Sequence, residues 1–146
     1  MCPSIAKWHI IILFNKLMSS KYICKTRKGR KPLNISRQST EKAKTLLNHK
    51  NYIFIDLRDY REIIKDGKIP GAYSCPRGML EFWIDPNSPY HKKIFNQKKT
   101  YIFYCASAWR SALSCKTAME MGLKSVYSLK GGYSEWKKLK GPFEMV

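Results

Sequence analysis

Two continuous apolar runs constrain the fold of this chain more than any other feature. The runs are Tyr52–Asp56 (YIFID) and Thr100–Tyr104 (TYIFY), and both are rich in β-branched and aromatic side chains. A strand that is apolar along its whole length has both faces buried, as in a parallel sheet covered by helices. The two runs therefore predict buried strands of a mainly parallel sheet.

Helical patterns alternate with strands along the rest of the chain. We expect helices over residues 40–49, 60–65, 77–84, 90–95, 111–121 and 134–139, and shorter strands at 73–74 and 126–129. Ser39 or Thr40 can cap the first helix, and Gly122 can end the long one. Regular alternation of strands and helices indicates an α/β domain.

Charge is distributed unevenly along the 146 residues. The formal net charge is +18, yet the first 40 residues hold nine Lys or Arg and no acid, and residues 41–146 hold a net charge of +9. We therefore expect a basic extension over residues 1–34 and a folded domain over residues 35–146. The excess charge favours an anionic partner, such as a small acidic substrate or an acidic protein.

The extension leaves the location of the protein open between two alternatives. Residues 10–14 form a short apolar run between lysines, as in a targeting segment, so residues 1–17 would direct the chain to an organelle or out of the cell. Alternatively, translation begins at Met18 and the protein is cytoplasmic, which we prefer. No apolar run approaches the roughly 18 residues of a membrane span.

The cysteines argue against a disulfide scaffold and against a metal site. There are five of them, an odd number, with no Cys-x-x-Cys pair and no Cys/His ligand spacing; they are Cys2, Cys24, Cys75, Cys105 and Cys115. We expect no metal and no cofactor, and reduced thiols in a cytosol-like compartment. Cys75 and Cys115 are expected to fill the core.

Cys105 stands at the end of a predicted buried strand, where the chain turns through small residues into a helix. The connecting residues are Ala106, Ser107, Ala108 and Trp109, followed by Arg110. Such a loop can point its amide groups inward beside the positive end of the helix, which favours a thiolate and an incoming anion. The alternative is an inert buried cysteine.

Four motifs, in order, resemble those of the rhodanese family, the single-domain sulfurtransferases. They are Asp56-Leu57-Arg58, Ile69-Pro70-Gly71-Ala72, Cys105-x-x-x-x-Arg110-Ser111 and Leu129-x-Gly131-Gly132-Tyr133-x-x-Trp136. The resemblance covers residues 35–146. It implies a sheet of about five strands with helices on both faces.

The resemblance also implies a two-step transfer of sulfur through a persulfide on Cys105. The donor would be a small sulfur anion such as thiosulfate, and the acceptor cyanide or a thiol. Arg110 would be a second catalytic residue, and the loop of Ala106, Ser107, Ala108 and Trp109 would bind substrate. Arg58 would contact the anion and Asp56 would orient the loop, unless the two form a structural ion pair.

Two positions depart from the family pattern. Lys68 stands before Ile69 where the family often has histidine, and Ala108 stands where many members have glycine. If that second position needs a positive φ, alanine strains the loop.

Three other functions stay open as alternatives. The related cysteine phosphatases and arsenate reductases share this fold, but the phosphatase loop is one residue longer than the four residues between Cys105 and Arg110. A non-catalytic sulfur carrier or binding module is the third alternative. A nucleic-acid partner is not expected, because the chain has no recognition motif.

Overall fold

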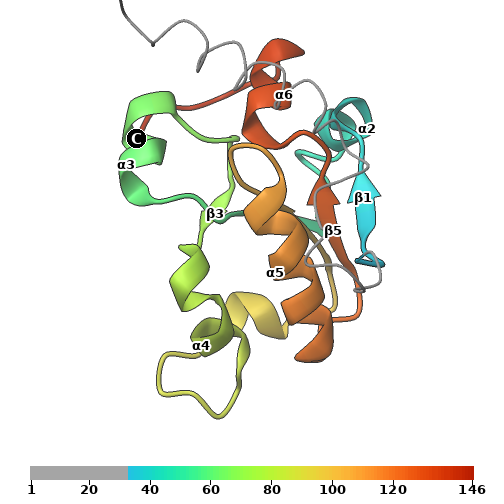
Figure 1. The fold of residues 1–146 in the computed structure, drawn as a ribbon, viewed down its shortest axis with the longest axis vertical. Helices are drawn as coiled ribbons and strands as arrows, with labels where there is room; N and C mark the ends of the chain where they lie inside the picture. The colour runs from blue at the N-terminus through green and yellow to red at the C-terminus, as the bar shows by residue number, and fades with distance from the viewer. Residues whose placement is uncertain (1–32) are drawn as a thin grey trace, which may run out of the picture. The chain divides into compact units, whose positions relative to one another are not determined.

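The structure, a computed structural model, describes residues 33–146, and its centre is a five-stranded sheet. The strands are β1 (Ser36–Gln38), β2 (Tyr52–Asp56), β3 (Tyr73–Ser74), β4 (Thr100–Tyr104) and β5 (Val126–Leu129). Their order is β1-β5-β4-β2-β3, and every pairing between them is parallel. Figure 1 shows the edge strand β1 beside β5. The predicted α/β fold with a mainly parallel sheet is therefore confirmed.

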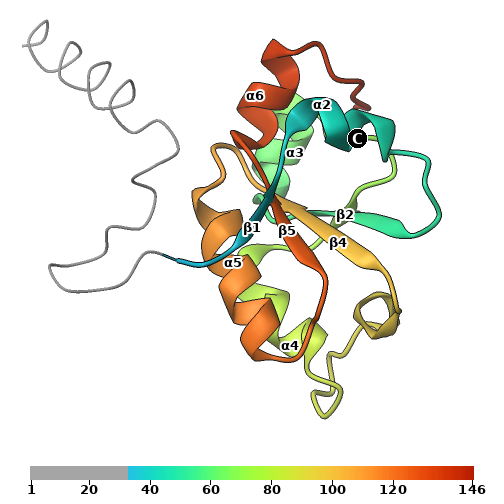
Figure 2. The same ribbon diagram turned by 90° about the vertical axis from the view of Figure 1, so that its right-hand side faces the viewer.

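Helical elements cover both faces of this sheet. They are α2 (Thr40–Thr45), α3 (Tyr60–Asp66), η1 (Arg77–Met79), α4 (Leu80–Ile84), η2 (Lys93–Asn96), α5 (Trp109–Glu120) and α6 (Gly132–Lys138). α4 and α5 lie together on one face, and α2 and α6 lie on the other (Figure 2). None of the helices within residues 33–146 is long and apolar enough to cross a membrane.

Alternate side chains of β4 enter two separate hydrophobic cores. Tyr101 and Phe103 face the core under α4 and α5, whereas Ile102 and Tyr104 face the core under α2 and α6. All four are at most 1% exposed. This two-sided burial is the physical reason for the continuous apolar runs in the sequence.

The structure differs from the predicted elements in four places. β1, which pairs with β5, was not among the predicted strands. α2 ends at Thr45 instead of residue 49. The helix predicted over residues 134–139 is α6, which begins two residues earlier than predicted, at Gly132. α5 also begins two residues earlier than predicted, at Trp109, directly after the Cys105 loop. The predictions on residues 1–17 and Met18 lie outside the described residues.

Candidate active site

Cys105 follows the last residue of β4, a central strand of the sheet. It is 1% exposed, and residues 106–108 join it to α5. Ligands of open parallel sheets bind beyond the carboxyl ends of the strands, where Cys105 stands. Within residues 33–146, no group accepts a hydrogen bond from the amides of residues 106–111. These amides lie in the loop and the first turn of α5, where the helix dipole is positive.

Ala108 holds the loop in a left-handed conformation, with φ 69° and ψ 5°. The position before α5 therefore requires a positive φ. From the sequence, we expect an alanine to strain the loop in that case. A β-carbon in this region costs about 1–2 kcal/mol relative to the right-handed region.

Replacing Ala108 by glycine is therefore expected to stabilise the domain. Relief of the strain outweighs the extra entropy that glycine gives the unfolded chain, so we expect a gain of about 1 kcal/mol in the free energy of unfolding. Ala106→Gly is the matched control, because Ala106 has no positive φ. In urea titrations the two variants should shift in opposite directions, and a loss of stability in both would contradict the strain.

The first residues of α6 hold the Cys105 loop in place through backbone contacts. The Tyr133 amide donates to the Cys105 carbonyl at 2.8 Å, and the Ser134 amide donates to the Ala106 carbonyl at 3.0 Å. Gly132, with φ +63°, lies so close that a β-carbon there would meet the Cys105 carbonyl oxygen at 2.5 Å. Gly132 thus permits the contact that fixes the base of the loop.

Two hydroxyl groups lie behind the thiol. The Cys105 Sγ is 3.8 Å from Ser111 Oγ, and Ser111 Oγ shares a 2.8 Å hydrogen bond with Ser128 Oγ. Both serines are buried, whereas Ser107 in the loop is exposed. Ser111 therefore provides the hydroxyl group next to the sulfur.

Arg110 forms a two-pronged ion pair with Glu62 at the start of α3. Its Nη1 donates to Oε2 at 2.7 Å and its Nη2 donates to Oε1 at 2.8 Å. Glu62 also accepts from the Asp59 amide at 2.9 Å, so the carboxylate is held by the capping box of α3. The hydrogen bond to Glu62 raises the pKa of Arg110, and the Cys105 sulfur raises it further. Arg110 thus connects the loop to α3.

The same contact lowers the pKa of Glu62 from 4.5 to about 2, mainly through the hydrogen bond from Arg110. A carboxylate with a depressed pKa stabilises the fold above its ordinary pKa, and this contribution is lost as pH falls through the native value. We expect the stability difference between the wild type and Glu62→Gln to shrink between pH 4.5 and about 2. The side chains are 38% and 34% exposed, so the difference should be about 1 kcal/mol or less.

Chemical denaturation at several pH values measures this difference. Glu41→Gln is the control, because Glu41 is exposed and forms no ion pair within residues 33–146. A Glu62→Gln difference that stays constant down to low pH would contradict the stabilising ion pair.

Arg58 and Asp56 lie in the interior. Arg58 is 1% exposed and Asp56 is 0% exposed, and their closest nitrogen and oxygen atoms are 2.7 Å apart. Arg58 also donates to the Gly67 carbonyl at 2.7 Å, and its guanidinium lies 4.0 Å from the centre of the Tyr133 ring. Burial opposes the charge of Arg58, but the hydrogen bond to Asp56 keeps its pKa above the ordinary value. This is the geometry of a structural ion pair rather than of a substrate contact.

The remaining loop and cysteine residues fall into two groups. Trp109 is 43% exposed at the first turn of α5, so its ring can meet a substrate or a partner. Cys75 and Cys115 are fully buried, and burial raises the pKa of each thiol to about 12. These two thiols stay protonated at neutral pH, as expected for core residues.

Comparison with protein families shows to which family the chain belongs. The profile of the family described as "Rhodanese-like domain" matches residues 39–139. The chain belongs to this family. The matched residues include the whole Cys105 loop and the strands and helices that support it.

Relatives of this rhodanese-like domain carry different descriptions. The mouse thiosulfate sulfurtransferase/rhodanese-like domain-containing protein 3 is 30% identical over 122 residues, which are 80% of this chain and 73% of the relative. A solved structure from Rhodopseudomonas palustris is 51% identical and covers 75% of this chain and 85% of its own, with a TM-score of 0.74. It is described as a protein of unknown function and possible tyrosine phosphatase.

A rhodanese-related protein from Thermoplasma volcanium supports the fold alone. Its structure is 22% identical, covers 76% of this chain and 99% of its own, and has a TM-score of 0.63.

Sequence reasoning did not identify Glu62, Ser128 or the packing role of Gly132. The spacing Asp59-x-x-Glu62 is a readable capping box, but its pairing with a residue 48 positions away carries no local signal. Ser128 is a polar residue inside a buried strand, which could have been noted as a residue that needs a partner.

Proposed function

We propose that this rhodanese-like domain is a sulfurtransferase that carries sulfur as a persulfide on Cys105. The placement of Cys105 carries the proposal: the thiol stands at the end of β4, inside a loop of amides that continues into α5. Such a loop favours a thiolate, and it also favours the anionic persulfide that the reaction forms. The sulfurtransferase name of the mouse relative supports the same reaction.

The reaction consists of two displacements at one sulfur atom. In the first, the Cys105 thiolate attacks the outer sulfur of thiosulfate, the sulfur–sulfur bond of the donor breaks, and sulfite leaves with the electron pair. In the second, cyanide or a thiolate attacks the outer sulfur of the persulfide, and the Cys105 thiolate is restored. Neither step needs an oxidant or a general base.

The neighbouring residues position the loop. Arg110 is a positioning residue, because both of its terminal nitrogens are bound to Glu62. Its positive charge still interacts with the Cys105 sulfur, and this interaction contributes to the raised pKa of Arg110 after the larger effect of Glu62. The Cys105 thiol donates to Ser111 Oγ at 3.8 Å, and the same hydroxyl can donate in return once the sulfur has lost its proton.

A cysteine-dependent phosphatase is the second candidate, since the relative from Rhodopseudomonas palustris is described as a possible tyrosine phosphatase. Two features disfavour it. Only four residues separate Cys105 from Arg110, which leaves less room than a tetrahedral phosphate needs. In addition, Arg110 would have to give up its ion pair with Glu62 to hold a phosphate with two nitrogens.

Parallel assays of the purified chain distinguish the two functions. With thiosulfate and cyanide we expect thiocyanate to form with repeated turnover, and with an aryl phosphate we expect no phosphate release above the uncatalysed rate. Turnover of the aryl phosphate without any thiocyanate formation would reverse the assignment. Turnover of neither substrate by folded protein would favour the non-catalytic module.

A further inference from the structure

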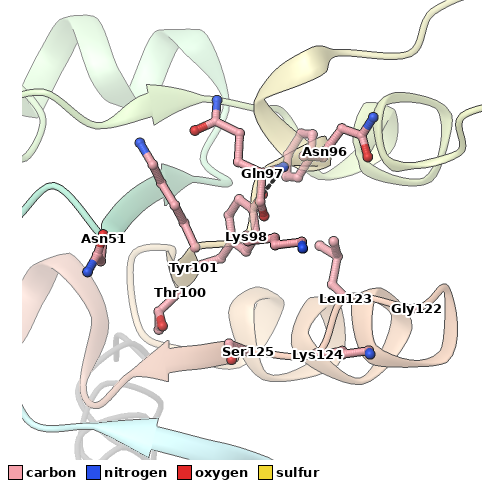
Figure 3. A pocket seen from close by; sticks show the side chains of 12 residues that line it. Asn51, Asn96, Gln97, Lys98, Thr100, Tyr101, Gly122, Leu123, Lys124 and Ser125 are labelled. Atoms are coloured by element: carbon pink, nitrogen blue, oxygen red, sulfur yellow. Dashed lines mark hydrogen bonds between the residues drawn. The ribbon is translucent and has the colours of Figure 1, made fainter.

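A pocket of about 730 Å³ lies at the end of the sheet opposite to Cys105. Figure 3 shows it between the segment that leads into β4, which carries Gln97 and Lys98, and the turn before β5, which carries Leu123 and Lys124. Asn51, which precedes β2, lies at its side. The strands are parallel, so their amino ends meet here, and the carboxyl end of β4 leads to Cys105. The pocket is therefore separate from the sulfur site.

The pocket is lined by positive charge without any compensating acid. Lys98, Lys99 and Lys124 line it, and none of them forms an ion pair within residues 33–146. No aspartate or glutamate is among the lining residues, which otherwise provide amide and hydroxyl groups from Asn51, Asn96, Gln97, Thr100 and Ser125. Three lysines on the lining of one pocket make its electrostatic potential positive, so an anion bound there is attracted by all three.

Hydrogen bonds hold the walls in place. The Thr100 amide donates to the Asn51 carbonyl and the Tyr101 amide donates to the Ser125 carbonyl, each at 2.9 Å. The Tyr101 hydroxyl donates to the Ile94 carbonyl at 2.8 Å and lies 3.1 Å from the Gln97 carbonyl. A ligand therefore meets a preformed backbone and orders only the lysine and amide side chains.

The walls also limit the kind of anion that fits. The lining aromatic residues, Phe95 and Tyr101, are 4% and 1% exposed and stack on each other with ring centres 5.8 Å apart. Neither ring offers a face to a nucleobase or another aromatic group. A hollow of this volume has room for a small molecule.

We propose that this pocket binds a compact polyvalent oxyanion of the diphosphate or triphosphate class. Several negative charges on one small ligand can contact Lys98, Lys99 and Lys124 together, while the neighbouring amide and hydroxyl groups donate to its remaining oxygens. A sulfur anion such as thiosulfate carries fewer charges and is the weaker ligand here.

Calorimetry of the full chain with inorganic tripolyphosphate at about 0.15 M salt tests the proposal. The triple variant K98Q/K99Q/K124Q is compared with K42Q/K130Q/K138Q, which removes three exposed lysines outside the pocket. Both variants lose the same charge and keep the basic residues 1–40. We expect binding to weaken at least about tenfold in the pocket variant and less than about twofold in the control.

Side-chain amide resonances of Asn51 and Gln97 locate the ligand independently, since both residues line the pocket. They should shift on addition of tripolyphosphate. Equal weakening in both triple variants, or unchanged resonances, would show a general charge effect and overturn the proposal. Binding of an oligoglutamate without any binding of tripolyphosphate would indicate a protein contact and would also overturn it.

Discussion

Replacing Cys105 by serine is expected to abolish sulfur transfer from thiosulfate to cyanide. The thiocyanate rate should fall by at least about a thousandfold, because a serine hydroxyl cannot form the persulfide that links the two half-reactions. The substitution changes one buried atom that lies 3.8 Å from Ser111 Oγ, so the fold should persist. Circular dichroism and thiocyanate formation measured on the same samples separate activity from folding.

Cys115→Ala is the matched control for this result. Cys115 is fully buried, and burial raises the pKa of its thiol to about 12, so it supplies no thiolate at neutral pH. We expect its activity to stay within about twofold of the wild type, with a modest loss of stability from the small cavity. Full activity in Cys105→Ser, or an equal loss in Cys115→Ala, would refute the assignment of the nucleophile.

Replacing Gly132 by alanine is expected to disrupt the Cys105 loop and the fold together. The new β-carbon would lie 2.5 Å from the Cys105 carbonyl oxygen, 2.7 Å from that of Ala106 and 2.8 Å from the Ala108 nitrogen. All three atoms belong to backbone, which cannot move away without breaking the hydrogen bond from the Tyr133 amide. We expect a loss of about 3 kcal/mol or more in the free energy of unfolding.

Gly71→Ala separates the backbone strain from the clash. Gly71 has φ +72°, close to the +63° of Gly132, but a β-carbon there meets nothing within 4 Å. Its substitution should therefore cost about 1–2 kcal/mol and leave sulfur transfer unchanged. Urea titration measures the loss of stability in each variant, and the alkylation rate of Cys105 measures the disturbance of the loop. Equal losses in the two variants would show that the contact with the loop is unimportant.

Periodicity and turn residues predicted most of the fold that positions the site. The apolar runs identified β2 and β4, and Gly122 placed the end of the long helix α5 within a few residues. β1 was not predicted, because its three residues, Ser36–Gln38, are polar and form only an edge strand. Nothing in such a segment shows that it pairs with a strand some 90 residues later.

The site could be predicted only where its residues are neighbours in sequence. The loop from Cys105 to Arg110 could be predicted because it follows directly from the end of a buried strand. Ala108 within it has the positive φ at which an alanine is expected to strain the loop. The burial of Arg58 could not be predicted in the same way. The charge of Arg58 is compensated by Asp56, two residues earlier in the sequence. It also lies against the ring of Tyr133, which only the fold brings close to it.

Mass spectrometry of the full chain after treatment with thiosulfate and desalting tests the central claim most directly. We predict an added mass of one sulfur atom on the peptide that contains Cys105, and its removal as thiocyanate when cyanide is added. Added sulfur on the peptide of Cys75 or Cys115, or no added sulfur on correctly folded protein, would contradict a Cys105 persulfide.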